Sequence, residues 1–171
     1  MTSGPARWLA RYRVRLGFAA AIAAFWLAQP TRRSLAIGAA IAVAGEALRI
    51  WAAGHLQKGQ EVTASGPYRL TRHPLYAGSA LMGVGFAIAS ASLLTTALIA
   101  VYFVLTVGAA IRTEEQHLTE KFGQAYPDYR EGRASAAADR GFSFSRAMRN
   151  REYRSMSGLA AALALLLWKV L

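Results

Sequence analysis

Cysteine is absent from the 171 residues, which excludes disulfides, thiolate metal sites and a cysteine nucleophile. Charged residues are also scarce, at 17% against roughly 25% in soluble domains. Acidic residues are the scarcest charged type, because nine of them face 20 basic ones and leave a net charge of +11. Hydrophobic residues reach 54%, which excludes intrinsic disorder.

The hydrophobic residues are concentrated in long blocks rather than spread along the chain. A bilayer core about 30 Å thick needs roughly 20 helical residues, and the block over 75–111 shows no polar face of the kind that a soluble surface helix needs. A signal peptide is the alternative interpretation of the first block, but no small-residue cleavage site closes it. We therefore predict one all-α integral membrane domain over 1–171 with about five transmembrane helices, at approximately 9–28, 35–54, 75–91, 93–111 and 158–171.

The basic residues predict the orientation of these spans. Sixteen of them lie in the N-terminal segment up to Arg15, in 55–74 or in 112–158, whereas Arg32, Arg33 and Lys169 lie on the other side and Arg49 lies within a span. Positive loops stay in the cytoplasm. The sequence thus predicts a cytoplasmic N-terminus and a cytoplasmic-face site, with anionic lipid rather than nucleic acid as the partner of the positive charge.

A loop before the third predicted span is the first candidate for chemistry. Gly66-Pro67 marks a turn, and Pro74 fits the first position of a helix. His73 then stands at the helix mouth with Arg69 and Arg72, where the helix dipole favours an anion. The alternative is an ordinary basic juxtamembrane loop, and the residues alone leave the two interpretations open.

The acidic pair Glu114-Glu115 follows the fourth predicted span. Glu115 shares a helical stripe with apolar neighbours, so the helix is expected to run on to Gly123 and to turn Glu115 inward, with Glu114 about 100° away. An inward carboxylate needs a partner, which is either an arginine or a ligand. Aromatic and basic residues lie nearby in the next segment: Tyr126, Tyr129, Arg130 and Arg133.

Two further features are predicted to be structural. Glu46 and Arg49 lie three residues apart within a span and are expected to pair with each other. Gly83 and Gly85 favour close helix packing, which is common in membranes. The histidines His55, His73 and His117 do not share the spacing of metal ligands, and no metal site is predicted.

Taken together, these motifs resemble the superfamily of isoprenylcysteine carboxyl methyltransferases and phospholipid methyltransferases. The resemblance runs from about Gly66 to Tyr129, and its core is Gly66-Pro67-Tyr68 followed by Arg72-His73-Pro74-Leu75-Tyr76-Ala77-Gly78. It implies S-adenosylmethionine as the methyl donor. It also implies cofactor binding by Arg72, His73, Tyr76, Gly78, Gly83, Gly85, Glu114 and Glu115.

The resemblance breaks after the second tyrosine, where the superfamily usually carries an arginine and a proline near the methyl acceptor. Tyr129 is followed instead by Arg130-Glu131-Gly132-Arg133 and an alanine-rich stretch. We expect Arg133, and after it Arg140, to replace the displaced arginine. The catalytic group expected on this basis comprises Arg133, Glu115 and Arg130.

The predicted function is methylation of a lipid-like or prenylated small acceptor, with a carboxylate preferred because arginines rather than an obvious base crowd the site. An amine on a phospholipid headgroup is the first alternative. A sterol-type reductase that uses a nicotinamide dinucleotide is the second, although Leu75 stands where such reductases typically have asparagine. A non-enzymatic membrane protein is the third, and the oligomeric state stays open.

Overall fold

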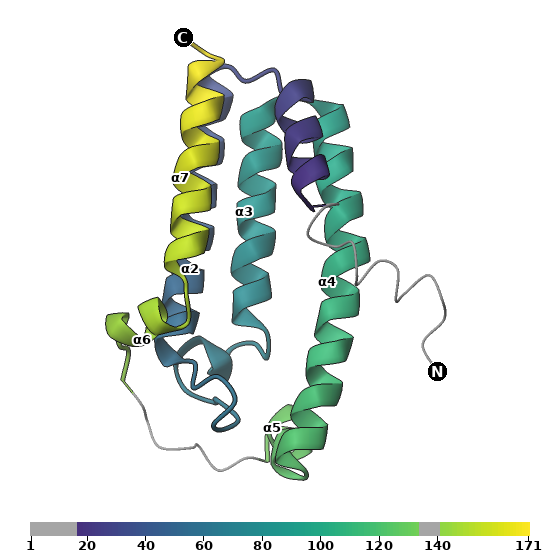
Figure 1. Cartoon of the computed structure of the whole chain (residues 1–171), viewed down its shortest axis with the longest axis vertical. Helices are drawn as coiled ribbons and strands as arrows, with labels where there is room; N and C mark the ends of the chain where they lie inside the picture. The colour runs from purple at the N-terminus through teal and green to yellow at the C-terminus, as the bar shows by residue number, and fades with distance from the viewer. Residues whose placement is uncertain (1–16, 134–140) are drawn as a thin grey trace.

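The computed structural model describes residues 17–133 and 141–171, and within these ranges it is built from helices without strands (Figure 1). The first helix is Gly17–Leu27. The elements that follow are α2 (Arg32–His55), the short 3-10 helix η1 (Gly66–Arg69), α3 (Pro74–Ser90), α4 (Leu93–Phe122), α5 (Ala125–Arg130), α6 (Phe144–Arg149) and α7 (Tyr153–Trp168).

Five apolar helices run roughly alongside one another, one in each segment predicted to span (Figure 1). By length and composition, α2 and α4 can cross a membrane, whereas Gly17–Leu27, α3 and α7 are shorter apolar helices. The start of the predicted 9–28 span lies outside the described residues. As predicted, α4 continues past the apolar block and ends at Gly123, whose φ of 55° is one that glycine adopts readily.

Helices α2 and α3 form the tightest pair of the bundle because glycines remove the side chains between them. A Cβ atom on Gly38 would lie 2.4 Å from the Gly85 carbonyl oxygen, and one on Gly78 would lie 2.7 Å from the Gly45 carbonyl oxygen. Two glycines from each helix thus let the backbones touch, the small-residue packing that membrane helices use.

The short helix α6 packs on the C-terminal end of α2 and sets where α7 begins. Arg146 donates to the Gly54 carbonyl at 2.6 Å, and Asn150 donates to the carbonyls of Ala53 and Leu56 at 2.8 and 2.9 Å. These donors satisfy carbonyls that the end of a helix leaves unpaired. α7 then runs back along the bundle beside α2 (Figure 1).

The C-terminal end of α7 is hydrogen-bonded to the C-terminal end of the first helix. The Lys169 ammonium donates to the carbonyls of Phe25 and Ala28 at 2.8 and 2.7 Å, and to that of Trp26 at 3.3 Å. A cation at the C-terminal end of a helix complements its dipole. Lys169 therefore links the first and the last of the helices that the structure describes.

Candidate functional site

The predicted loop and the predicted acidic helix meet in the structure. His73 Nε2 lies 3.0 Å from Glu115 Oε1, and a guanidinium nitrogen of Arg72 lies 3.5 Å from the same oxygen. We call Arg72, His73 and Glu115 the helix-mouth cluster. It joins the start of α3 to the charged continuation of α4 beyond Ile111.

Local sequence explains why these side chains converge. Pro74 is the first residue of α3 and His73 is its N-cap, because a proline needs no hydrogen-bond acceptor at that position. On α4, Glu115 lies on the less exposed stripe with Leu118 and Phe122, while Glu114 is exposed. This confirms the predicted orientation of the acidic pair. At 27% exposure, the Glu115 side chain stays accessible to solvent and to a ligand.

Aromatic side chains surround the cluster. The ring of Tyr76 lies 6.0 Å from that of His73, and the Tyr129 hydroxyl donates to the Tyr68 carbonyl at 2.7 Å. Tyr126 is only 2% exposed, and its hydroxyl interacts with the Glu115 carboxylate. A buried phenol therefore adjoins the carboxylate of the helix-mouth cluster.

The cluster shifts the acidity of its members. The hydrogen bond with His73 is the main reason that the pKa of Glu115 is lowered, and the charge of Arg72 acts in the same direction. Burial, followed by the negative charge of Glu115, raises the pKa of Tyr126 to about 12. Burial likewise raises the pKa of Tyr68. At neutral pH the site thus combines an ionised carboxylate with neutral phenols.

The glycines assigned to cofactor binding divide into two groups. Gly78 and Gly85 face α2, where a Cβ atom would lie 2.6 Å from Arg49 Cγ and 2.6 Å from the Gly38 carbonyl oxygen, respectively. Their contacts on this side are those of helix packing, and their assignment to cofactor binding stays a prediction. Gly83 faces α4 instead, where an added Cβ atom would lie 2.9 Å from the Phe103 ring.

The arginines expected near the acceptor are paired elsewhere. Arg133 makes ion pairs with Asp128 at 3.0 Å and with Glu131, and Arg130 lies 3.9 Å from Glu131. These partners belong to the same short segment, so the structure does not bring Arg130 or Arg133 into the helix-mouth cluster. Arg140 lies outside the described residues.

A second cluster, which the sequence did not predict, lies inside the bundle. Arg49 lies 3.8 Å from Glu46, as its spacing suggested, but it makes a closer ion pair with Glu152 at 2.7 Å. It also donates to Ser155 at 3.1 Å and to Ser79. We call Glu46, Arg49, Ser79, Glu152 and Ser155 the Arg49 cluster. The predicted pair of Glu46 and Arg49 is therefore present, and the structure adds a closer partner for Arg49, Glu152 at the start of α7.

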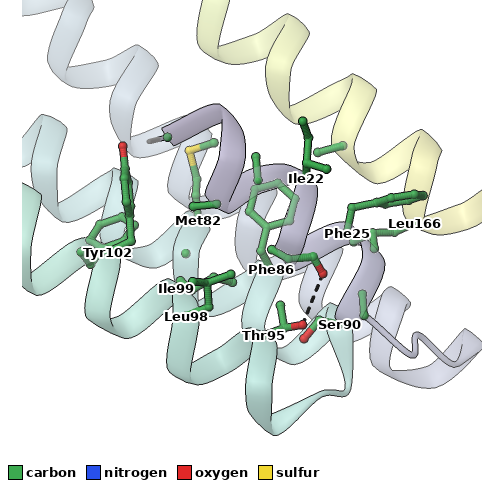
Figure 2. Close-up of a pocket in the computed structure, with 18 of the residues that line it drawn as sticks. Ile22, Phe25, Met82, Phe86, Ser90, Thr95, Leu98, Ile99, Tyr102 and Leu166 are labelled. Atoms are coloured by element: carbon green, nitrogen blue, oxygen red, sulfur yellow. Dashed lines mark hydrogen bonds between the residues drawn. The ribbon is translucent and has the colours of Figure 1, made fainter. Parts of the chain in front are cut away.

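A cavity of about 780 Å³ lies between Gly17–Leu27, α3, α4 and α7. Figure 2 shows Ile22 and Phe25 opposite Met82 and Phe86, with Leu166 at one side. The walls are mostly apolar, and of the described residues that line the cavity Arg49 is the only charged one. This volume is in the range that accommodates one drug-sized ligand, about 300–1,000 Å³.

The described residues contain no group of three or more histidine, aspartate or glutamate side chains placed to hold a metal ion.

The fold and site together define a bundle of apolar helices that carries a histidine–carboxylate cluster where two of its helices leave the apolar region. The phospholipid methyltransferase family matches residues 12–125. The chain belongs to this family, which places it in the same superfamily as the isoprenylcysteine carboxyl methyltransferases and implies methyltransferase activity.

Two named relatives are similar over part of the chain. One is the cobalt-zinc-cadmium resistance protein CzcN of Cupriavidus metallidurans, 36% identical over 97 residues, which are 56% of this chain and 42% of that protein. The other is the nickel-cobalt-cadmium resistance protein NccN of Alcaligenes xylosoxydans xylosoxydans, 33% identical over 95 residues, which are 54% of this chain and 43% of that protein. The match thus spans less than half of each relative. No solved structure matches the chain significantly.

Proposed function

We propose that this chain is an S-adenosylmethionine-dependent methyltransferase of the membrane that acts on a lipid-like or prenylated acceptor. The observation that carries the proposal is the convergence of His73 and Arg72 on Glu115, at 3.0 and 3.5 Å, in a chain whose family implies methyl transfer. These residues come from two motifs that are 42 positions apart in sequence.

The residues of the helix-mouth cluster fit the polar groups of S-adenosylmethionine. Arg72 and His73, at the N-terminal end of α3, suit its carboxylate, and the ionised Glu115 suits its ammonium or ribose hydroxyls. The Tyr126 hydroxyl, buried beside Glu115, provides a further polar group at the same place. When bound, the cofactor supplies a methyl group already activated on a sulfonium.

The chain's own residues would contribute alignment and exclusion of water. Methyl transfer is an in-line displacement, so placing the acceptor and keeping the site dry are the main requirements. The face of Tyr76, beside His73, suits a sulfonium cation. Glu115 would position the donor rather than take up a proton, because its lowered pKa makes it a weak base at neutral pH.

The acceptor that we propose first is a carboxylate, as in isoprenylcysteine carboxyl methyltransferases, because it needs no general base. A phospholipid amine is the second candidate, and one observation favours it. Arg130 and Arg133, the expected cationic clamp, are already paired with Glu131 and Asp128. The names of the two relatives refer to metal resistance, and the proposal assigns this chain no metal ligand.

For the membrane arrangement, we propose five spans with the N-terminus and the helix-mouth cluster on the cytoplasmic side. The support is the excess of basic residues flanking that end of the bundle. A reporter fused after Leu171 should be active outside the cytoplasm. Reporter activity on the cytoplasmic side would remove one span from the arrangement.

Calorimetric titration of the purified full chain with S-adenosylmethionine, and separately with NADPH, tests the activity class. We expect saturable binding of S-adenosylmethionine and none of NADPH. NADPH binding alone would favour the reductase alternative, and binding of neither would favour a non-enzymatic protein.

His73→Ala should lower the affinity for S-adenosylmethionine by about 1.5–3 kcal/mol, the cost of one hydrogen bond to a charged group. His117→Ala is the matched control, because His117 is exposed on α4 near Glu115 and is no member of the cluster. Equal affinities in the two variants would place the cofactor elsewhere in the chain.

A further inference from the structure

The turn that joins α6 to α7 carries positive charge without acidic partners. Arg149, Arg151 and Arg154 are all exposed. No carboxylate of the residues that the structure describes forms an ion pair with any of the three. The single acidic residue of 141–171, Glu152, is only 4% exposed and pairs with Arg49. The described part of the protein therefore leaves the charge of this turn unneutralised.

Aromatic side chains are exposed beside these arginines. Phe142, Phe144 and Tyr153 are 49%, 54% and 49% exposed, respectively. The guanidinium of Arg154 lies over the Tyr153 ring, 6.0 Å from its centre. Large rings in contact with water are unfavourable, whereas rings next to cations suit the boundary between lipid headgroups and acyl chains. The composition of this surface is thus that of a membrane interface.

The side chains that hold α6 in place are different from those that it exposes. Arg146 and Asn150 donate to carbonyls at the end of α2, at distances between 2.6 and 2.9 Å. Ala147, between them, is completely buried. Phe144 and Arg149 stay exposed although they belong to the same helix. The exposed residues are therefore carried on a helix that other contacts already fix.

The position of α6 matches the edge of a bilayer. It packs on the C-terminal end of α2, where the predicted span 35–54 ends, and it precedes α7, where the predicted span 158–171 begins. Figure 1 shows α6 beside the bundle, at the end that also carries η1. A short helix in this place lies in the headgroup region of a bilayer that α2 and α7 cross.

We propose that this surface binds anionic phospholipids of the leaflet in which α6 lies. Arg149, Arg151 and Arg154 contact the lipid phosphates, and Phe144 and Tyr153 lie among the first carbons of the acyl chains. We call these five residues the headgroup surface. Guanidiniums suit phosphate oxygens, and three unneutralised cations favour a lipid of net negative charge over a zwitterionic one.

The headgroup surface is separate from the family-matched part of the chain. It lies beyond residues 12–125, which the phospholipid methyltransferase family matches, and none of its residues belongs to the helix-mouth cluster. The assignment requires that α2 and α7 cross a membrane, but it does not depend on methyl transfer. A failure of the proposed function would therefore leave it standing.

Native mass spectrometry of the purified full chain in detergent micelles tests the charge requirement. The chain is titrated with dioleoylphosphatidylglycerol, which is anionic, or with dioleoylphosphatidylcholine, which is zwitterionic. The headgroup variant combines Arg149→Gln, Arg151→Gln and Arg154→Gln and leaves Arg146 in place. The control variant removes the same charge from exposed positions that the sequence predicts on the same side of the membrane, by Lys58→Gln, Arg112→Gln and Lys121→Gln.

We expect the headgroup variant to bind phosphatidylglycerol about tenfold more weakly than the native chain, and the control variant to stay within about threefold. Phosphatidylcholine binding should be equal in all three. Equal losses in the two variants would mean that the overall positive charge, rather than this surface, attracts the lipid, and would overturn the assignment. Displacement of the lipid by inorganic phosphate, or tighter binding of a single-stranded oligonucleotide at the same arginines, would also overturn it.

Spin labels test the depth of the surface, and the absence of cysteine from the chain allows a single label at a chosen position. Phe144→Cys and Lys58→Cys are labelled and placed in phosphatidylglycerol nanodiscs. The label at position 144 should be more accessible to oxygen than to a water-soluble nickel chelate, and the label at position 58 should show the reverse. Equal accessibility to the chelate at both positions would refute the interfacial placement. This measurement decides the matter if the headgroup variant does not fold.

Discussion

Two clusters in this molecule bring an arginine to a glutamate, and they differ in burial and in origin. In the helix-mouth cluster, Arg72 and Glu115 are 3.5 Å apart with side chains 47% and 27% exposed. In the Arg49 cluster, Arg49 and Glu152 are 2.7 Å apart, and the Glu152 side chain is 5% exposed. The first pair is open to water and ligands, and the second is packed between helices.

The difference separates a site that can exchange partners from one that cannot. A half-exposed ion pair contributes little to stability, so Glu115 can leave Arg72 for a ligand at small cost. A buried pair loses much more when one partner is removed, because the other charge is left without compensation. We therefore expect changes in the first cluster to affect binding and changes in the second to affect folding.

The largest effect should follow from Arg49→Met. It leaves Glu152 and Glu46 buried without a cation, which should lower the free energy of unfolding by about 3–5 kcal/mol. Thermal unfolding in detergent micelles measures the loss. A double variant that also carries Glu152→Gln should recover part of it, and no recovery would mean that Glu152 is not the main partner of Arg49.

A smaller effect should follow from Gly78→Ala. Gly78 is the last residue of the Arg72-His73-Pro74-Leu75-Tyr76-Ala77-Gly78 motif. The methyl group of an alanine there would lie 2.6 Å from Arg49 Cγ, and such overpacking costs about 1–3 kcal/mol. Gly108→Ala is the control, since nothing lies within 4 Å of the Cβ position there. Equal unfolding temperatures for the two variants would contradict the packing role of Gly78.

Glu115→Gln should reduce affinity rather than stability. It keeps the shape of the side chain and removes the charge, at a cost of about 1–3 kcal/mol in S-adenosylmethionine binding. Glu114→Gln, one position away and exposed, should change binding little. Loss of stability at Glu115 with affinity intact would make the helix-mouth cluster a structural ion pair.

The smallest effect concerns pH. Because His73 lowers the pKa of Glu115 in the folded protein, the stabilisation is present at neutral pH and is lost as the pH falls through that lowered pKa. For a partly exposed pair we expect roughly 0.2–1 kcal/mol. Acid titration of thermal stability should show this loss in the native chain and a flatter curve in Glu115→Gln.

The sequence was sufficient to predict features that depend on neighbours along the chain. Apolar blocks located the five apolar helices, Pro74 located the start of α3, and a stripe on α4 gave the inward direction of Glu115. Each of these follows from local geometry, since a block, a cap or a helical stripe involves residues within a few turns.

Features that depend on partners far along the chain were missed. Glu152 stands 103 positions from Arg49, and no spacing rule connects a residue of α2 to the N-cap of a helix that comes so much later. The pairing of Arg133 with Asp128 and Glu131 was missed for another reason. The resemblance to the family predicts that Arg133 contacts the methyl acceptor, whereas carboxylates only two and five positions away pair with it.

The separation of Arg49 from Glu152 has a consequence for biogenesis. The ribosome adds about 5–20 residues per second, so Glu152, 103 positions later, is synthesised roughly 5–20 s after Arg49. During that interval α2 exists without α7. Glu46 lies on the same helix as Arg49, 3.8 Å from it in the finished fold, and is the carboxylate available to pair with it. The pair that is secondary in the finished bundle would then be the one that compensates the charge of Arg49 until Glu152 and α7 are synthesised.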